Sequence, residues 1–574
     1  MEMKVVDLVV ALDIGTTYSG FACQFRGTFE INPADIWTRT HGPDISSHKT
    51  KTCILIRKDD DTIHSFGTIA ERNFLRMDDT GESNKFMFFT GFKMLLYEKS
   101  FKERMVEAEP CGDHRSVKFV MSKFIEALKN DCLKKFMENR SIRLNMDNIR
   151  WVVTVPSIWN ESAKAVMREA SKEAGIPGNQ LLLALEPEAA AIHCLYLPKE
   201  ERSGMGNLGH VGDKFAIIDM GGGTVDITAI EVLENGQLRE LARSNGGAWG
   251  AQNVNHAFQQ HLRDNFKTAT ACSVLEECSR VELLEVENDF EQQKINIGLH
   301  ATKEDEWIKL KLPNNLWMKV FPIIKIEEAK FSNFFQISEN GLSFNSDLIR
   351  NFLFKETLSE IIKHIQTEIK SNSLVGVKKF VLVGGFSESP ITKGEFHKEF
   401  PDIDIIIPTN PFYSVMKGAV LFGQRPDVFK TRISRYTYGV STSRKYDPAV
   451  HAPEKKIVLP SREEVCRDIF SIHVRKGEAV SLAGSQRSRI YTPLHENAKL
   501  VHFPFYQSEE TDPKYVTDAR CKRLGELVVD MPDTTGGRMR EVEVTIKYGW
   551  TELILNGVDK TTGKVCSVQF CIAE

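Results

Sequence analysis

Hydrophobic and polar positions follow one pattern in the first 425 residues and a different pattern in the rest of the chain. In the first 425 residues, short buried-strand runs alternate with segments of helical spacing. Residues 151–155 (WVVTV) are one such run, followed by a segment that Asn160 can cap and Gly175 can end. From about residue 427 onward, short alternating runs such as residues 541–546 (EVEVTI) are separated by turn residues. The pattern predicts α/β layers followed by an all-β domain of roughly 145 residues.

Two segments repeat one pattern at a long interval. Residues 10–22 (VALDIGTTYSGFA) and 216–230 (AIIDMGGGTVDITAI) each place an Asp at the end of an apolar strand, before a turn with Gly and Thr and a second apolar strand. Their aspartates, Asp13 and Asp219, lie 219 − 13 = 206 residues apart. A single glycine turn of this kind is most often an ordinary turn between strands. Two matched copies predict an internally duplicated fold with two facing lobes.

Composition places the chain among folded proteins of several domains. It has 574 residues, 41% hydrophobic and 26% charged, close to the average of globular proteins. At ~150 residues per domain, this length predicts three to four domains. Lys plus Arg number 74 and Asp plus Glu number 78, so the net charge is −4. Because a nucleic-acid-binding surface needs an excess of basic residues, we expect no nucleic-acid partner.

The chain shows no pattern of a membrane span or an export signal. No stretch reaches the ~18 consecutive apolar residues of a spanning helix, and residues 1–10 lead into a strand-like run without a cleavable apolar segment. The 11 cysteines are odd in number and form no CxxC pair, so neither a disulfide framework nor a zinc site is expected. These features predict a soluble protein with reduced thiols, located in the cytoplasm or the nucleus.

The two repeated turns carry residues suited to a nucleotide. Backbone N–H groups approach phosphate oxygens closely where side chains are absent, and threonine hydroxyls add donors to the same oxygens. The positions concerned are Gly15, Thr16, Thr17, Gly221, Gly222, Gly223 and Thr224. Asp13 and Asp219 would face each other across the cleft, where Mg²⁺ held largely through water needs carboxylate oxygens. The sequence therefore predicts a Mg²⁺–nucleotide site between two lobes.

Beyond these turns, the glycine motif at residues 383–390 (VGGFSESP) resembles the actin-like, sugar-kinase-like and heat-shock-70 ATPase superfamily. Three segments are similar to the heat-shock-70 (Hsp70) chaperones in particular: residues 154–175 (TVPSIWNESAKAVMREASKEAG), 185–192 (LEPEAAAI) and 558–564 (VDKTTGK). The divergence of the chain resembles the atypical 12A/12B branch of that family. The resemblance implies a duplicated actin-like (ribonuclease H-like), two-lobed ATPase domain followed by a small all-β sandwich domain.

The resemblance also implies domain limits. ATPase lobe I is expected at residues 1–200 and lobe II at residues 201–426, with the chain returning to lobe I near residues 186–200 and 405–425. Residues 427–574 would form a β-sandwich domain that binds substrate or partner proteins. Since only residues 571–574 remain after the last expected strand, we expect this domain to have no helical lid.

Position by position, the resemblance assigns roles in both lobes. The residues expected in catalysis are Asp13, Lys93, Glu186, Asp219 and Thr224, with Asp13 and Asp219 also as Mg²⁺ ligands. Those expected to bind ATP or ADP are Gly15, Thr16, Thr17, Tyr18, Gly221, Gly222, Gly223, Glu291, Lys294, Gly384, Gly385 and Phe386. Two assignments have plain alternatives, Lys93 as an exposed surface lysine and Glu186 as an acid at a helix N-terminus.

The expected adenine pocket departs from the family pattern. In the helix motif that begins at Glu291, the usual Arg is Ile295, and Phe412 stands where the family has an Asp. Loss of the guanidinium removes a planar cation that stacks on a base. Phe386 and Phe412 can stack in its place, each contact worth ~1 kcal/mol. The sequence therefore predicts phosphate binding more firmly than the identity of the base.

The segment between the domains departs as well. Residues 427–435 (DVFKTRISR) are basic and poor in leucine, where the family has an acidic, leucine-rich strand. Pro156 and Lys164 match the family's proline switch and its relay residue, with Lys replacing Arg. Addition of such a linker to the ATPase lobe as a strand would lose the usual apolar side chains. Weak coupling between nucleotide state and the β domain is therefore expected.

The resemblance implies an ATP-binding chaperone that hydrolyses ATP slowly with Mg²⁺ and binds client proteins through its β domain, with nucleotide-exchange co-chaperones as further partners. A second interpretation is a nucleotide-sensing adaptor or scaffold with negligible ATPase activity. A metabolite kinase on the same superfamily fold is disfavoured, because a β domain with the VDKTTGK segment is typical of chaperones.

Overall fold

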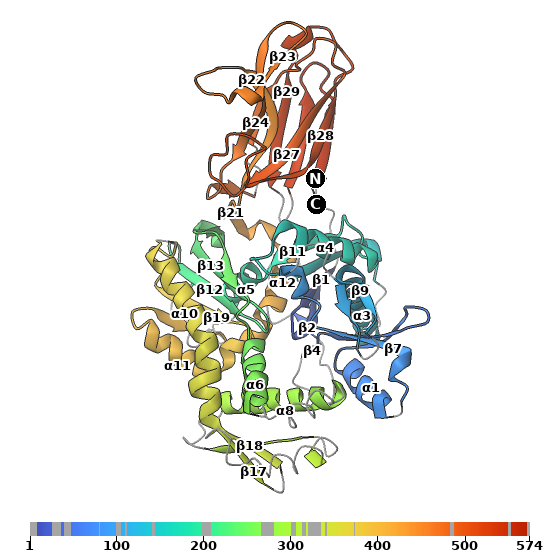
Figure 1. Cartoon of the computed structure of the whole chain (residues 1–574), viewed down its shortest axis with the longest axis vertical. Coiled ribbons are helices and arrows are strands. Elements are labelled where there is room, and N and C mark those ends of the chain that lie inside the picture. The colour runs from blue at the N-terminus through green and yellow to red at the C-terminus, as the bar shows by residue number, and fades with distance from the viewer. Residues whose placement is uncertain are drawn as a thin grey trace.

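The computed structural model describes residues 8–25, 36–38, 48–79, 81–98, 105–109, 112–140, 144–197, 208–265, 280–299, 306–312, 317–318, 334–338, 341–371, 373–482, 487–548 and 553–570. In these ranges an α/β region is followed by an all-β region, as the sequence predicts. The β region stands at one end of the molecule (Figure 1). Residues 571–574, on which the expectation of a missing lid depends, lie outside the described ranges. No helix within the ranges has both the length and the apolar character needed to cross a membrane.

The first sheet is built around a hairpin of two apolar strands. β1 (Leu8–Ile14) pairs antiparallel with β2 (Tyr18–Phe25), and β10 (Ile149–Val155) and then β11 (Leu181–Leu185) extend the sheet in parallel on the side of β1. The short strands β3 (Trp37–Thr38) and β4 (Lys49–Lys51) pair with β2. Every residue of β1 is buried, as expected for a central strand covered on both faces.

The second sheet repeats this arrangement. β12 (Lys214–Met220) pairs antiparallel with β13 (Val225–Val232), and β19 (Lys379–Val383) and then β20 (Asp404–Ile406) follow in parallel on the side of β12. On the other side, β14 (Leu238–Glu240) and β15 (Asn245–Gly247) pair with β13. The two hairpins thus occupy equivalent places in two sheets of the same topology, which is the duplication predicted from the repeated turns.

Helices cover both faces of the first sheet. Leu8, Val10 and Leu12 pack in one core with α3 (Val117–Arg140) and α4 (Glu161–Glu173), whereas Val9 and Ala11 pack in another with α5 (Glu186–Tyr196) and α12 (Ser414–Gln424). This division follows the alternation of side chains along a strand.

The ends of α4 form as the sequence predicts. Asn160 Oδ1 accepts a hydrogen bond from Ala163 N at 2.9 Å, which caps the first turn. Gly175, directly after the helix, has a φ of +81°, a left-handed conformation that glycine adopts without strain.

The helices α5 and α12 cross where their residues are small. A Cβ atom on Gly418 would lie 1.8 Å from the carbonyl oxygen of Ala189, so the two backbones touch directly. A Cβ atom on Gly423 would lie 2.4 Å from Val9 Cγ1 of β1. Residues 414–424 therefore return the chain to the first sheet after the second sheet is complete.

Two smaller subdomains extend the lobes at the end of the molecule away from the β region (Figure 1). The subdomain of the first lobe comprises β5 (Cys53–Arg57), β6 (Ile63–Phe66), α1 (Gly67–Asp79) and β7 (Phe86–Thr90). In the second lobe the subdomain comprises α6 (Gln252–Asn265), α8 (Arg280–Leu299), β16 (Trp307–Leu310), β17 (Phe335–Ser338) and β18 (Gly341–Asn345). The helices α10 (Phe354–Lys370) and α11 (Pro390–Glu399) pack on β12 and β19 of the second sheet. Lys51 Nζ joins the two subdomains, because it lies 2.7 Å from Glu71 Oε2 and 2.5 Å from Asn288 Oδ1.

The β region contains two antiparallel sheets. One consists of β23 (Lys456–Val458), β24 (Glu464–Val474), β22 (Thr437–Lys445), β27 (Leu500–Ser508) and β28 (Cys521–Asp530) in that spatial order. The other consists of β26 (Arg487–Tyr491), β29 (Val542–Tyr548), β30 (Leu553–Asp559) and β31 (Val565–Phe570). Alternate residues of both sheets, among them Val440, Phe505, Val544 and Leu555, share one core, which is the arrangement of a β-sandwich.

The basic interdomain segment forms a strand on the second ATPase sheet. β21 (Phe429–Ile433) pairs in parallel with β14 and antiparallel with β25 (Ala479–Ser481). Phe429 packs in the apolar core that α5 and α12 share with β14. The later contacts of the strand are polar: Arg432 Nε and Nη2 lie 2.6 and 2.5 Å from the two carboxylate oxygens of Glu188, and Ile433 N donates to Glu240 Oε2 at 2.7 Å. Buried carboxylates thus hold the basic end of the linker, where the sequence predicted a loss of apolar side chains.

Candidate functional site

A cavity of about 330 Å³ lies between the two hairpins. The predicted site residues that line it are Asp13, Gly15, Thr16, Thr17, Tyr18, Glu186, Asp219, Gly221, Gly222, Glu291, Lys294, Gly384, Gly385 and Phe386. Lys93, Gly223 and Thr224 do not line it and lie directly behind its wall. The structure therefore brings residues from five separate stretches of the chain to one cleft.

The two turns meet closely because their glycines carry no side chains. A Cβ atom on Gly222 would lie 2.1 Å from Thr17 Oγ1, and one on Gly223 would lie 2.6 Å from Thr16 Oγ1. Thr17 Oγ1 is buried and has no hydrogen-bond partner among the described residues. A buried hydroxyl without a partner is costly, so this position is suited to a ligand oxygen such as that of a phosphate.

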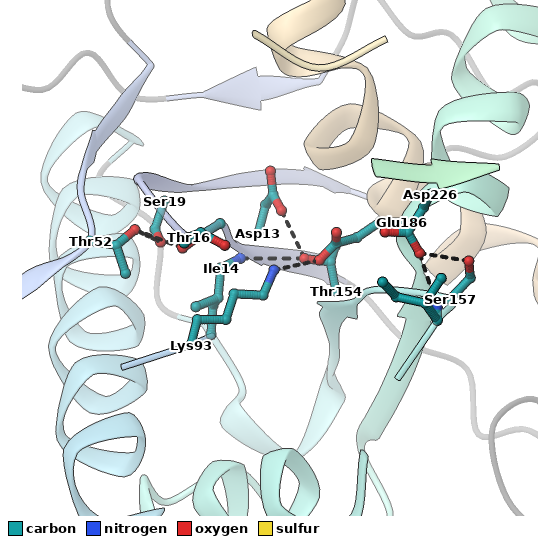
Figure 2. A network of polar contacts seen from close by, with 12 residues as sticks. Asp13, Ile14, Thr16, Ser19, Thr52, Lys93, Thr154, Ser157, Glu186 and Asp226 are labelled. Atoms are coloured by element: carbon teal, nitrogen blue, oxygen red, sulfur yellow. Dashed lines mark hydrogen bonds and ion pairs between the residues drawn. The ribbon is translucent and has the colours of Figure 1, made fainter. Parts of the chain in front are cut away.

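Thr224 stabilises the second glycine turn through its backbone. Its carbonyl oxygen accepts a hydrogen bond from Gly221 N at 3.0 Å, which closes the turn, and its side chain is buried. The next residue but one, Asp226, accepts hydrogen bonds from Ser157 Oγ at 2.7 Å and Ile158 N at 3.0 Å, and Figure 2 shows this contact. Asp226 thereby ties the second hairpin to the segment between β10 and α4.

The carboxylate of Asp13 is held on both sides by groups of the chain. Oδ1 accepts from Thr154 Oγ1 at 2.8 Å, as Figure 2 shows, and Oδ2 lies 2.7 Å from Lys49 Nζ. Burial, and then the negative charges of Glu186, Asp226 and Asp13, raise the pKa of Asp219 well above its usual value. A bound cation would relieve this repulsion. Among the described residues, no group of three or more His, Cys, Asp or Glu side chains is arranged to hold a metal directly.

Lys93 and Glu186 form an ion pair inside the protein (Figure 2). Lys93 Nζ lies 2.8 Å from Glu186 Oε1, and only 4% and 10% of the two side chains are exposed. This burial excludes the alternative of an exposed surface lysine. Glu186 is also the first residue of α5, so the pair lies at a helix N-terminus that favours the carboxylate. Burial still raises the pKa of Glu186 to about 7, against the opposing effect of Lys93.

The raised pKa of Glu186 leads to a testable dependence of stability on pH. The folded state binds its proton more tightly than the unfolded state, so this group's contribution to the free energy of unfolding falls as pH rises from about 4.5 to about 7. Glu186→Gln is fixed in the neutral form and should show no such fall. In thermal unfolding, we expect the melting temperature of Glu186→Gln relative to wild type to be higher at pH 8 than at pH 5.5. A difference that does not change with pH would contradict the burial of an ionised Glu186.

On the other side of the cavity, α8 supplies an internally satisfied pair. Lys294 Nζ lies 2.7 Å from Glu291 Oε2 and 2.9 Å from Asn255 Oδ1, and Asn255 Nδ2 donates to Glu291 Oε2 at 2.6 Å. Ile295, at the position where the family has an Arg, also lines the cavity and is 40% exposed. The wall of the expected base pocket is therefore partly apolar.

Glycines also bring the opposite wall of this pocket close. Gly384 has a φ of +84°, and a Cβ atom there would lie 2.4 Å from the carbonyl oxygen of Met220. The Phe412 ring lies against Gly385, 3.1 Å from where its Cβ would be, and contacts Tyr18 edge to face at 5.8 Å. Phe386 is 4% exposed and packs 5.6 Å from Phe354 in the core of the second lobe. Both phenylalanines line the cavity, and Phe412 is the more exposed of the two.

Several lining residues were not predicted from the sequence: Lys49, Ala251, Phe354, Ser389 and Val415. Lys49 lies in a short strand whose neighbours give no motif, and residues 39–47, shortly before it, lie outside the described ranges. The pairing of β4 with β2 brings it to the cavity. The role of Lys49 in the cavity could not be predicted from the sequence, because no motif or spacing along the chain connects it with Asp13.

Comparisons with known proteins agree with these features. A family model described as Hsp70 protein matches residues 9–424. Heat shock 70 kDa protein 12A of Homo sapiens is 30% identical over 625 aligned residues, which cover 98% of this chain and 91% of that protein. The protein of the same name from Mus musculus is 29% identical, over 99% of this chain and 92% of that protein. Heat shock 70 kDa protein 12B of Homo sapiens is 29% identical, over 97% of this chain and 90% of that protein.

Proposed function

The chain belongs to the Hsp70 family, whose members bind ATP, and we propose that it hydrolyses Mg²⁺–ATP slowly and binds segments of other proteins through its β domain. The observation that carries the nucleotide part is the buried Thr17 hydroxyl between two glycine turns, which has no partner among the described residues. A phosphate oxygen would provide the missing acceptor. The phosphates of ATP would therefore lie between the lobes.

Hydrolysis at such a site would depend on positioning and charge, with no covalent intermediate. When bound, Mg²⁺ would neutralise charge on the phosphates, with Asp13 and Asp219 holding it through water. The Lys93 ammonium, kept in place by Glu186 at 2.8 Å, would orient the attacking water. Because Lys93 and Thr224 lie just behind the cavity wall, their roles would require the lobes to close on the nucleotide.

We assign partner binding to the edges of the β-sandwich. Val458 on β23, Ile490 on β26 and Val565 on β31 lie on edge strands and are 62%, 57% and 62% exposed. An edge strand with exposed apolar side chains is suited to pairing with an extended segment of another protein. The partners would be unfolded or extended client proteins in the cytoplasm or nucleus, and nucleotide-exchange co-chaperones would act on the ATPase lobes.

One observation favours a second function, a nucleotide-sensing adaptor with negligible ATPase activity. Both carboxylate oxygens of Asp13 are engaged, by Thr154 and Lys49, which leaves less room for a water-bridged metal. Steady-state turnover of ATP in the presence and absence of a hydrophobic peptide separates the two functions. Turnover stimulated by peptide supports the chaperone, and no turnover under either condition supports the adaptor.

The Thr17 hydroxyl provides a selective test of nucleotide binding. Thr17→Val puts a methyl group in place of a hydroxyl that has no partner in the described part of the chain, so the melting temperature of the free protein should not fall. Its affinity for ATP in Mg²⁺, measured by isothermal titration, should fall about 10-fold because one bond to a charged phosphate is lost. Wild-type protein at a hundredfold excess of ATP over Kd should gain ~2.7 kcal/mol in unfolding free energy.

Thr392→Val is the matched control. Thr392 Oγ1 is likewise buried and without a partner among the described residues, but it lies in α11, outside the cavity lining. Equal affinities for wild type and Thr392→Val are expected. If millimolar Mg²⁺–ATP leaves the melting temperature of the wild-type protein unchanged, nucleotide binding at this cleft is wrong.

A further inference from the structure

Lys49 is a buried cation inside the cavity, and the hydrolysis proposed above gives it no role. Its side chain is 8% exposed, and Nζ lies 2.7 Å from Asp13 Oδ2. The same Nζ lies 4.4 Å from the centre of the Phe412 ring, within the range of a cation–π contact. An aromatic face and a carboxylate thus fix one ammonium group between the phosphate turn and the expected base pocket.

The backbone around Lys49 is shaped to admit this side chain. Lys49 lies opposite Gly20 in the pairing of β4 with β2. A Cβ atom on Gly20 would lie 2.9 Å from Lys49 Cγ and 2.7 Å from the carbonyl oxygen of His48. A larger residue in β2 would therefore displace the lysine stem from its route to Asp13. The ammonium position depends on a glycine in the hairpin that bears the phosphate turn.

The lining of the cavity carries more acidic than basic side chains, so the positive charge of Lys49 reduces the repulsion between them. Five carboxyl side chains belong to the lining: Asp13, Glu186, Asp219, Glu291 and Glu388. Of the two lysines in the lining, Lys294 lies against Glu291 and Asn255 on the far wall. A nucleotide would bring further negative charge to a site that already contains these carboxylates. Without a positive charge near Asp13, this arrangement would be strongly repulsive.

We propose that Lys49 is a phosphate-binding residue that supplies the positive charge beside Asp13. As a consequence, the site would bind nucleotide with little dependence on Mg²⁺. This proposal rests on the nucleotide binding proposed above. A divalent cation bound at Asp13 would have to share the carboxylate with Thr154 on Oδ1 and with the Lys49 ammonium on Oδ2, and the two cations would repel each other. In this structure the Lys49 ammonium therefore already neutralises the Asp13 carboxylate. Lysine is suited to the task, because it binds phosphate as a compact point charge.

Titration calorimetry with ADP in Mg²⁺ and in EDTA tests the proposal. For wild type we expect the two dissociation constants to agree within about 10-fold, since a charged hydrogen bond from Lys49 replaces part of the metal's contribution. Lys49→Met should weaken ADP binding in EDTA by about 10- to 100-fold. In Mg²⁺ the loss should be smaller, because the metal can then reach Asp13. Lys49→Arg, which keeps the charge, should retain most of the binding in EDTA.

Lys85→Met is the control, since Lys85 is a 71% exposed lysine of the same lobe, and its titrations should match wild type. Wild-type binding that is lost by more than about 100-fold in EDTA would overturn the proposal without any variant. An equal loss for Lys49→Met in Mg²⁺ and EDTA would also overturn it and make the Lys49–Asp13 pair purely structural. Absence of ADP binding by wild type even in Mg²⁺ would refute both this proposal and the proposed function.

Discussion

Arg432→Met is expected to release the interdomain strand from the ATPase lobes. The Arg432 and Glu188 side chains are 13% and 2% exposed and form a bidentate pair, so the variant leaves the Glu188 carboxylate buried without its cation. Removing one partner of such a pair costs about 3–5 kcal/mol. Cleavage at Phe429 or Ile433 by thermolysin, which cuts beside apolar residues, should therefore accelerate by about 100-fold or more when cleavage requires undocking.

Two further variants separate docking from general stability. In Arg432→Met/Glu188→Met both charges are replaced by apolar groups, so most of the protease resistance should return. Arg475→Met breaks the ion pair with Asp512, whose side chains are 51% and 65% exposed, and should leave cleavage of β21 unchanged. Wild-type resistance in Arg432→Met would mean that the remaining contacts of β21, including its backbone pairing with β14 and β25, hold the strand without this ion pair.

Local features of the sequence predicted the parts of the fold that depend on local geometry. An Asp at a strand end followed by a glycine turn is read from neighbouring residues, and both hairpins form where this pattern occurs. The cap at Asn160 and the left-handed Gly175 have the same origin, because the interactions span only a few residues. Duplication of the motif then sufficed to predict two facing lobes, and the structure shows that their sheets share one topology.

Contacts between distant residues were much harder to predict. Arg432 and Glu188 are 244 positions apart, and the composition of the linker indicated only that apolar docking was lost. The structure compensates with buried carboxylates on α5 and β14, which no property of the linker reveals. Phe386 illustrates the same limit, since the sequence allows its ring to face either a base or the core, and most of it packs in the core.

Lys93→Met is expected to slow ATP hydrolysis far more than it weakens ATP binding. Lys93 lies behind the cavity wall, paired with Glu186, so it contributes little to the bound ground state. A group that acts on the attacking water matters chiefly in the transition state, and its loss should lower the single-turnover rate by about 100-fold. Titrated affinity for ATP should stay within about 3-fold of wild type.

The same variant should also change the pH dependence of the reaction. Lys93 lowers the pKa of Glu186 by its charge and its hydrogen bond, so without the lysine this pKa should rise above its present value of about 7. The residual hydrolysis of Lys93→Met should then require a higher pH than that of wild type. Lys118→Met, which removes a 45% exposed lysine of the same lobe, is the control for rate, affinity and pH profile. An unchanged single-turnover rate in Lys93→Met would leave the buried pair with a structural role and would transfer the positioning of water to another group of the cleft.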